Sequence, residues 1–276
     1  MRRILFYTLV VASTHFATGC ATQPTFEYSP TESKAMNLAR ASGIDAELKD
    51  TEVPKNPTGS FTNSPGFALA YTWSGYQAPV GSLSPTSTAS LNLFSSVLSP
   101  TSPSSRLSVF GWSEHIGSEM EAVENMQNAL SSATTAYLKE AGLKGESSVV
   151  RSKKQLGLSF EIVDEANGCP TNNCFVVYII NQPEFVAKST TEMCSYETGC
   201  WFYDPSDTVR SEFQIRYRNE DTPKLNEYEI FSGISSHLPE WVFLYVAPNK
   251  LHINDEDKIK IPVILSKSGP LYFVTP

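Results

Sequence analysis

The sequence predicts an α+β fold, in which a mostly antiparallel sheet carries one long helix and follows a more irregular N-terminal part with short helices. Three observations lead to this prediction. Residues 118–141 form the clearest amphipathic helical segment, and strand-like segments dominate the chain after it. Residues 241–246, Trp-Val-Phe-Leu-Tyr-Val, are apolar on both faces, as in a central buried strand. One long helix among mostly antiparallel strands is typical of an α+β domain.

The helix expected over residues 118–141 carries signals at both ends. Ser118 is a suitable N-cap, and Glu119 and Glu121 place negative charge where the helix dipole favours it. Gly142 is expected to end the helix. Its apolar face consists of Met120, Val123, Met126 or Gln127, Leu130, Ala133 and Tyr137.

Strands are expected on both sides of this helix, with a second helix over residues 223–236. An acidic turn over residues 254–257 leads into a final hairpin. The predicted strands are residues 106–112, 156–163, 174–181, 209–218, 240–247, 259–265 and 270–274.

The N-terminal part is less regular. Residues 31–42 are predicted to form a short helix. Residues 51–66, which are rich in Pro, Thr, Asn and Gly, are predicted to form a linker. The aromatic residues of segment 67–76 alternate as in a strand, and a helix is the alternative prediction for this segment. Residues 82–105 are dense in Ser, Thr and Pro and are expected to hold a short amphipathic helix between two loops.

The composition argues against a nucleic-acid partner. The chain has 21 Lys and Arg against 29 Asp and Glu, a formal net charge of −8. Such an acidic chain repels phosphate backbones, and the sequence has no basic stripe. The hydrophobic fraction of 41% suffices for a core, and no apolar stretch approaches the length that spans a bilayer.

The first twenty residues have the pattern of an export signal. Arg2 and Arg3 precede an apolar run over residues 4–12, which is too short to span a bilayer but has the length of a secretory signal core. Ala17-Thr18-Gly19-Cys20 then resembles the lipobox of bacterial lipoproteins, in which small residues precede an obligatory cysteine.

The resemblance implies a lipid anchor. In that family the cysteine thiol is joined to diacylglycerol and the signal is cut so that the cysteine, here Cys20, becomes the first residue. The residue after the cysteine, Ala21, resembles what the family has in its outer-membrane members. This implies an outer-membrane anchor, with the rest of the chain in the periplasm or at the cell surface. The alternatives are a plain secretory signal cut at the same point and an uncleaved membrane anchor.

The domain organisation expected from these features has three parts. Residues 1–19 are the signal peptide, and residues 20–65 are a tether with a short helix and a linker. Residues 66–276 are the exported globular region, most clearly so over residues 104–276.

Cysteine counting supports the lipoprotein interpretation, because five cysteines are an odd number for an exported protein and lipidation of one leaves four. In an oxidising compartment these four are expected to form two disulfides. Sequential pairing, Cys169 with Cys174 and Cys194 with Cys200, is favoured because turn-forming residues lie within each loop. The alternative is a four-thiolate zinc site, for which the spacing of the second pair is wrong.

No catalytic signature stands out, and we predict no catalytic residue, cofactor or metal. Neither Gly-x-Ser-x-Gly nor a glycine-rich phosphate loop occurs. Trp73, Trp201 and Tyr203 are candidate aromatic contacts for a protein or a glycan, with core packing as the alternative. The sequence therefore favours a non-enzymatic lipoprotein that binds another envelope protein. The alternative is an envelope hydrolase or glycan-binding module acting on peptidoglycan or surface polysaccharide.

Overall fold

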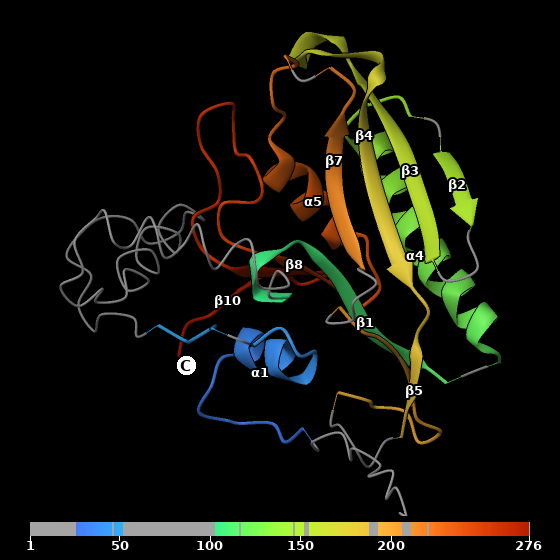
Figure 1. Ribbon diagram of the computed structural model, residues 1–276, viewed down its shortest axis with the longest axis vertical. Coiled ribbons are helices and arrows are strands. Elements are labelled where there is room, and N and C mark those ends of the chain that lie inside the picture. The colour runs from blue at the N-terminus through green and yellow to red at the C-terminus, as the bar shows by residue number, and fades with distance from the viewer. Residues whose placement is uncertain are drawn as a thin grey trace, which may run out of the picture.

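The protein has the predicted α+β fold, with two antiparallel sheets and three α-helices in the residues that are described (Figure 1). The computed structural model describes residues 26–45, 47–51, 103–115, 117–145, 147–151, 155–187, 193–205, 211–219 and 221–275. The predictions for Cys20, Trp73, segment 67–76 and nearly all of the linker and Ser/Thr/Pro segment lie outside these residues.

The larger sheet has six strands in the order β10-β9-β8-β1-β6-β5. Strand β8 lies inside this sheet between β1 and β9, and all five of its residues are buried. The prediction of a central buried strand is therefore confirmed. The strands are β1 Ser108–Glu114, β5 Glu184–Val186, β6 Cys200–Tyr203, β8 Val242–Val246, β9 Val263–Ser266 and β10 Gly269–Tyr272.

The smaller sheet is antiparallel and has the strand order β2-β3-β4-β7, so that β4 and its neighbour β7 are separated in the chain by β5 and β6 of the larger sheet. Every second residue of β3 and β4 turns its side chain into the core, as the period of a strand requires. The strands are β2 Ser147–Arg151, β3 Gln155–Asp164, β4 Cys169–Asn181 and β7 Glu212–Tyr217. The inward residues are Leu156, Leu158, Phe160 and Ile162 on β3 and Val176, Tyr178 and Ile180 on β4.

Helix α4, Glu119–Glu140, covers the inner face of this smaller sheet and contacts β3 (Figure 1). The Ser118 hydroxyl accepts from the Glu121 backbone N–H, and the Glu121 carboxylate accepts from the Ser118 N–H, which makes a capping box. Helix α5, Glu227–Ser236, packs on α4 and on β9 and β10. The main core lies between these two helices and the two sheets.

A second core lies on the opposite face of the six-stranded sheet, where α1, Lys34–Ala41, packs (Figure 1). Its aromatic centre stacks Trp112 on Phe202 with ring centroids 5.2 Å apart. The N-terminal segment also meets the C-terminal one, because Thr51 and Val274 form a parallel bridge. The six-stranded sheet is therefore covered on both faces.

Several predicted boundaries were wrong for local reasons. Helix α5 begins at Glu227 rather than residue 223, because the Asn226 side chain caps it by accepting from the Glu229 N–H. The strand predicted over residues 259–265 begins only at Val263. Ile259 instead bonds to the loop before it, through its N–H to the Leu251 carbonyl.

Strands β5 and β6 were not predicted. They contain three and four residues, too few to show an alternating pattern. Their partners are distant in sequence: Gly111 of β1 pairs with Tyr203, and Glu184 pairs with Phe202. This edge of the sheet is therefore a product of tertiary pairing.

Candidate binding sites

The four cysteines of the described residues form two disulfides, with the sequential pairing. Cys169 and Cys174 have Cα atoms 5.6 Å apart, and Cys194 and Cys200 have Cα atoms 5.7 Å apart. The first bridge is buried in the main core and the second in the core under α1. The alternative of a four-thiolate zinc site is wrong, because all four sulfurs are bonded to one another in pairs.

Tyr203, one of the aromatic residues considered for surface binding, belongs to the core. Its side chain is fully buried, and its hydroxyl donates to the Ala122 carbonyl of α4 at 2.6 Å. Burial raises the pKa of Tyr203 to about 12, against a small opposing effect of the Ser113 hydroxyl. Tyr203 thus joins β6 to α4 and is not available to a partner.

Trp201, by contrast, is half-buried and belongs to a group of three rings at the surface. The ring centroid of His115 lies 4.4 Å from that of Phe185 and 4.8 Å from that of Trp201. Phe185 and Trp201 are 6.4 Å apart, and the Phe185 side chain is 52% exposed. We call His115, Phe185 and Trp201 the aromatic surface cluster.

Strand pairing assembles this cluster from three separate segments. Phe185 of β5 lies opposite Trp201 of β6 in the antiparallel register. His115 directly follows β1, and its N–H donates to the Gly199 carbonyl just before β6. Trp201 was a candidate from the sequence, but His115 and Phe185 were missed as contact residues, because only this register brings them together.

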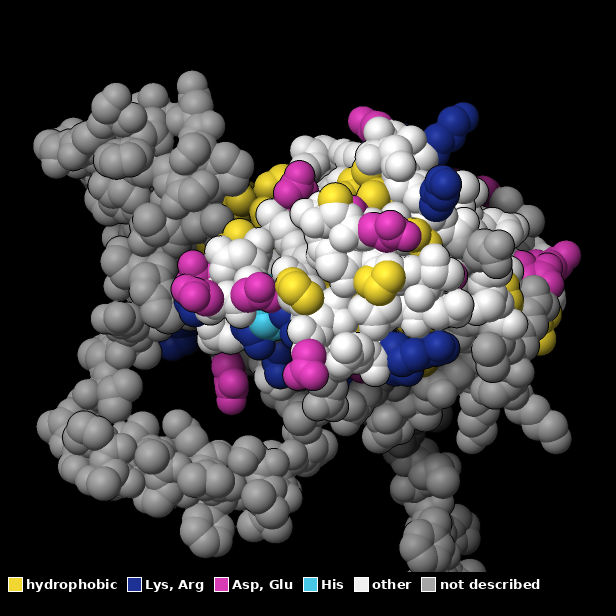
Figure 2. All heavy atoms as spheres, turned by 90° about the horizontal axis from the view of Figure 1, so that it is seen from above, with side chains coloured by type: hydrophobic (Ala, Val, Ile, Leu, Met, Phe, Trp, Pro, Cys, Tyr) yellow, Lys and Arg dark blue, Asp and Glu magenta, His cyan; other side chains and the backbone are white. Residues whose placement is uncertain are grey.

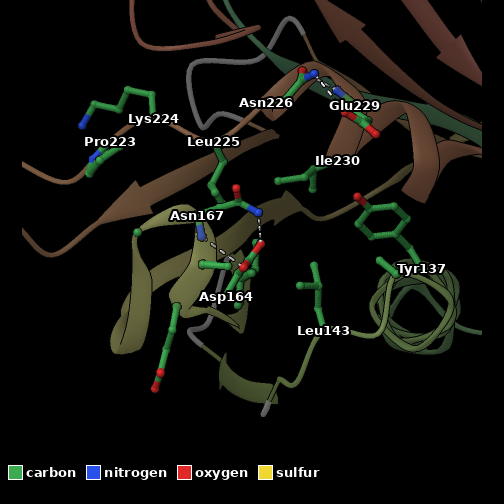
Figure 3. A pocket seen from close by; sticks show the side chains of 15 residues that line it. Tyr137, Leu143, Asp164, Asn167, Pro223, Lys224, Leu225, Asn226, Glu229 and Ile230 are labelled. Atoms are coloured by element: carbon green, nitrogen blue, oxygen red, sulfur yellow. Dashed lines mark hydrogen bonds between the residues drawn. The ribbon is translucent and has the colours of Figure 1, made fainter.

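A cavity of about 710 Å³ lies at the other end of α4. It opens between the C-terminal end of that helix, the 3-10 turn η2, Glu165–Asn167, and the start of α5 (Figure 3). Its apolar floor includes Leu143, Ile162, Leu225 and Ile230. No sequence pattern pointed to this cavity, because three separate segments form its walls.

The charged groups that line the cavity are mainly acidic. Asp164, Glu165 and Glu229 line it, against the single basic residue Lys224. The Lys224 ammonium lies 4.2 Å from the centre of the Tyr217 ring and points away from Asp164 in Figure 3. Tyr137 at the cavity wall has a raised pKa, first through burial and then through the negative charges of Glu229 and Asp164.

A third feature is an apolar groove on the outer face of the smaller sheet. It has a volume of about 410 Å³ and follows β4 past Phe175, Val177 and Ile179. The Arg218 guanidinium carbon lies 5.9 Å from the centre of the Phe175 ring at one end of this face. The groove is shallow and is bordered by small residues of β3, Gly157 and Ser159.

The surface seen in Figure 2 carries charges of both signs, and basic side chains do not gather into a stripe on that face. Within the described ranges, no group of three or more His, Cys, Asp or Glu side chains is placed to hold a metal ion. None of the helices in the described part of the chain is both long and apolar enough to cross a bilayer.

Comparison of the chain with protein-family models, with curated proteins and with solved structures gives no match.

Proposed function

We propose that this protein is a bacterial envelope lipoprotein, anchored by lipid at Cys20, whose globular part binds another envelope protein without catalysing a reaction. The observation that carries the proposal is the state of the cysteines. Four are paired in two disulfides, and the fifth is Cys20 in the lipobox-like Ala17-Thr18-Gly19-Cys20. Disulfides form in oxidising compartments, which is compatible with export.

Lipid on Cys20 would supply a firm membrane attachment. Each buried CH₂ group contributes about 0.8 kcal/mol of membrane affinity, so that two or three acyl chains hold a protein at the bilayer. The outer membrane is the proposed location, with the globular part in the periplasm or at the cell surface. The residues that directly follow Cys20 would then act as the tether.

The aromatic surface cluster is the proposed contact for the protein partner. Aromatic rings are enriched at the centres of protein interfaces, because they bury a large area at low conformational cost. Phe185 lies on β5, the outermost strand of the six-stranded sheet. A partner could therefore contact both the rings and the backbone of an edge strand.

The anchor is tested by growing cells with labelled palmitate and comparing the wild type with Cys20→Ala. We expect the wild-type chain to carry label, to sediment with membranes and to begin at residue 20. The Cys20→Ala chain should carry no label. The matched control, Cys194→Ala with Cys200→Ala, removes two cysteines but should keep the label. A native wild-type chain that begins at Met1 with five reduced thiols would overturn the proposal.

The partner contact is tested by photo-crosslinking from position 185 in intact cells. We expect a crosslink to one specific protein, and Trp201→Ala should weaken that crosslink. The control Val149→Ala, which replaces an exposed apolar residue elsewhere on the surface, should leave it unchanged. Phe185 and Trp201 also favour the second candidate function, glycan binding, because sugar rings stack on aromatic faces. Sedimentation with purified peptidoglycan that is lost in Trp201→Ala, without any protein crosslink, would support glycan binding instead.

A further inference from the structure

The cavity at the C-terminal end of α4 combines an apolar floor with acidic walls. Ile162, Leu225 and Ile230 have exposed fractions of 0%, 7% and 6%, so the floor is part of the main core. Leu143 is half-buried above them and points into the open space in Figure 3. An alkyl chain placed there would be removed from water, which is favourable because apolar surface is buried.

Two carboxylates face this cavity from different elements. Asp164 ends β3, and its oxygens accept from the Asn167 N–H at 3.3 Å and from the Asn167 side-chain amide at 2.7 Å. Glu229, in the first turn of α5, accepts from the Asn226 side-chain amide at 3.0 Å. These contacts orient both carboxylates, and each ionised carboxylate offers about four acceptor positions, so capacity for a donor in the cavity remains.

Asp164 and Glu229 line the cavity from two different elements, and Tyr137 lies in the same wall. Both Glu229 and Asp164 raise the pKa of the Tyr137 hydroxyl, after the larger effect of burial, which means that negative potential reaches this hydroxyl from two elements. The ammonium of Lys224, the basic residue of the lining, lies 4.2 Å from the centre of the Tyr217 ring. Within the described residues, neither Asp164 nor Glu229 forms a salt bridge.

We propose that this cavity binds an alkyl chain that ends in a cation. The alkyl part would lie on Leu143 and Ile230, and the cation would balance the negative charge of Asp164 and Glu229 and donate a hydrogen bond to a carboxylate oxygen. Charge-assisted hydrogen bonds of this kind are about twice as strong as neutral ones. The same chemistry occurs in a lysine side chain of a partner protein and in a free alkyl diamine. This site is separate from the aromatic surface cluster and does not depend on the lipid anchor.

The proposal is tested by nuclear magnetic resonance titration of the full chain carrying Cys20→Ser, so that no lipid is attached. The probes are N-acetyl-lysine amide, 1,5-diaminopentane and the uncharged analogue N-acetyl-norleucine amide. We expect both cationic probes to shift the backbone amide signals of residues 164–168 and 224–230. The norleucine probe should bind at least about ten-fold more weakly, which corresponds to 1.4 kcal/mol.

The variant that isolates the charges is Asp164→Asn with Glu229→Gln. Both substitutions keep an acceptor for the Asn167 and Asn226 amides, and Asn is as good a cap as Asp. We expect at least about ten-fold weaker binding of the cationic probes. The matched control, Glu119→Gln, removes a negative charge about 27 Å away at the other end of α4 and should change affinity less than about two-fold.

Equal binding of the lysine and norleucine probes, shifts confined to other residues, or an equal loss in Glu119→Gln would each overturn the proposal. Should the double variant not fold, the wild type alone still decides the point, because cation binding must weaken as ionic strength rises and norleucine binding must not. Affinity that does not depend on salt overturns the proposal. Among supporting results, tighter binding of the lysine amide indicates a protein side chain, and tighter binding of the diamine indicates a free amine.

Discussion

Glu227 is a carboxyl group buried at the start of α5, with an exposed fraction of 5%. Its oxygens accept from the Tyr217 hydroxyl at 3.1 Å and from the His252 N–H at 2.9 Å. Burial raises the pKa of Glu227. These hydrogen bonds and the nearby charges of His252 and Lys258 lower the pKa by a smaller amount, so that it lies above its ordinary value. The side chain therefore links α5, β7 and the loop before β9 while resisting ionisation.

This raised pKa predicts a pH-dependent loss of stability. The native pKa lies above the unfolded value of about 4.3, so the stabilisation is complete below that pH and is lost as pH rises through the native pKa. Glu227→Gln has no such proton to lose. Urea unfolding at pH 4 and pH 7 should show a larger fall in the wild type than in the variant. Parallel behaviour of the two proteins would contradict the assignment.

Gly233 sets the distance between α4 and α5. A Cβ atom at this position would lie 2.3 Å from Cε2 of Tyr137, far inside van der Waals contact. Gly233→Ala should lower the unfolding free energy. Overpacking costs about 1–3 kcal/mol, and the better helix propensity of alanine offsets only roughly 1 kcal/mol of that cost. In a Tyr137→Leu background the cost should shrink, because the ring is gone. Denaturant midpoints of the four proteins complete the cycle.

At the scale of the element, α4 depends on its capping box. Ser118→Ala removes the hydroxyl that accepts from the Glu121 N–H and should lower the unfolding free energy by about 1 kcal/mol. Ser132→Ala, in the exposed middle of the same helix, should be neutral or slightly stabilising, because alanine is the better helix former. Thermal unfolding of both variants checks this. Equal losses would show that the cap contributes nothing specific.

The capping carboxylate of α4 also titrates. Hydrogen bonds from Ser118 hold the pKa of Glu121 below its ordinary value. Its contribution is therefore present above the unfolded pKa and is lost as pH falls through the lowered native value, opposite in sign to Glu227. Between pH 7 and pH 3, the wild type should lose more stability than Glu121→Gln. Calorimetric melting of the two proteins across this range measures the difference.

At the scale of the whole molecule, the disulfides stabilise two different cores. Cys194–Cys200 closes a short loop beside the core under α1, and Cys169–Cys174 closes one beside the main core. Replacing either pair by alanine should cost about 2 kcal/mol, because short loops constrain the unfolded chain only modestly. Only the Cys194–Cys200 variant should also disturb Trp201, which lies next to Cys200. Tryptophan fluorescence together with urea unfolding separates the two effects.

Prediction from the sequence succeeded where the signal is local. The long helix was predicted as residues 118–141 and observed as Glu119–Glu140, because cap, acidic first turn and apolar face lie within one segment. Strand β8 was recognised because it is apolar on both faces. Strands β5 and β6 were missed because they are too short to carry a pattern. Without their pairing, the sequence could not show that His115 and Phe185 join Trp201.

The sequence by itself determined the fold class, the long helix, the buried central strand and the favoured pairing of the cysteines, since each depends on residues close together in the chain. Only the tertiary structure decided that Tyr203 belongs to the core, that His115 and Phe185 join Trp201, and that Asp164 and Glu229 share a cavity. The physical reason is that long-range strand pairing and helix packing bring these groups together, and local periodicity carries no record of distant partners.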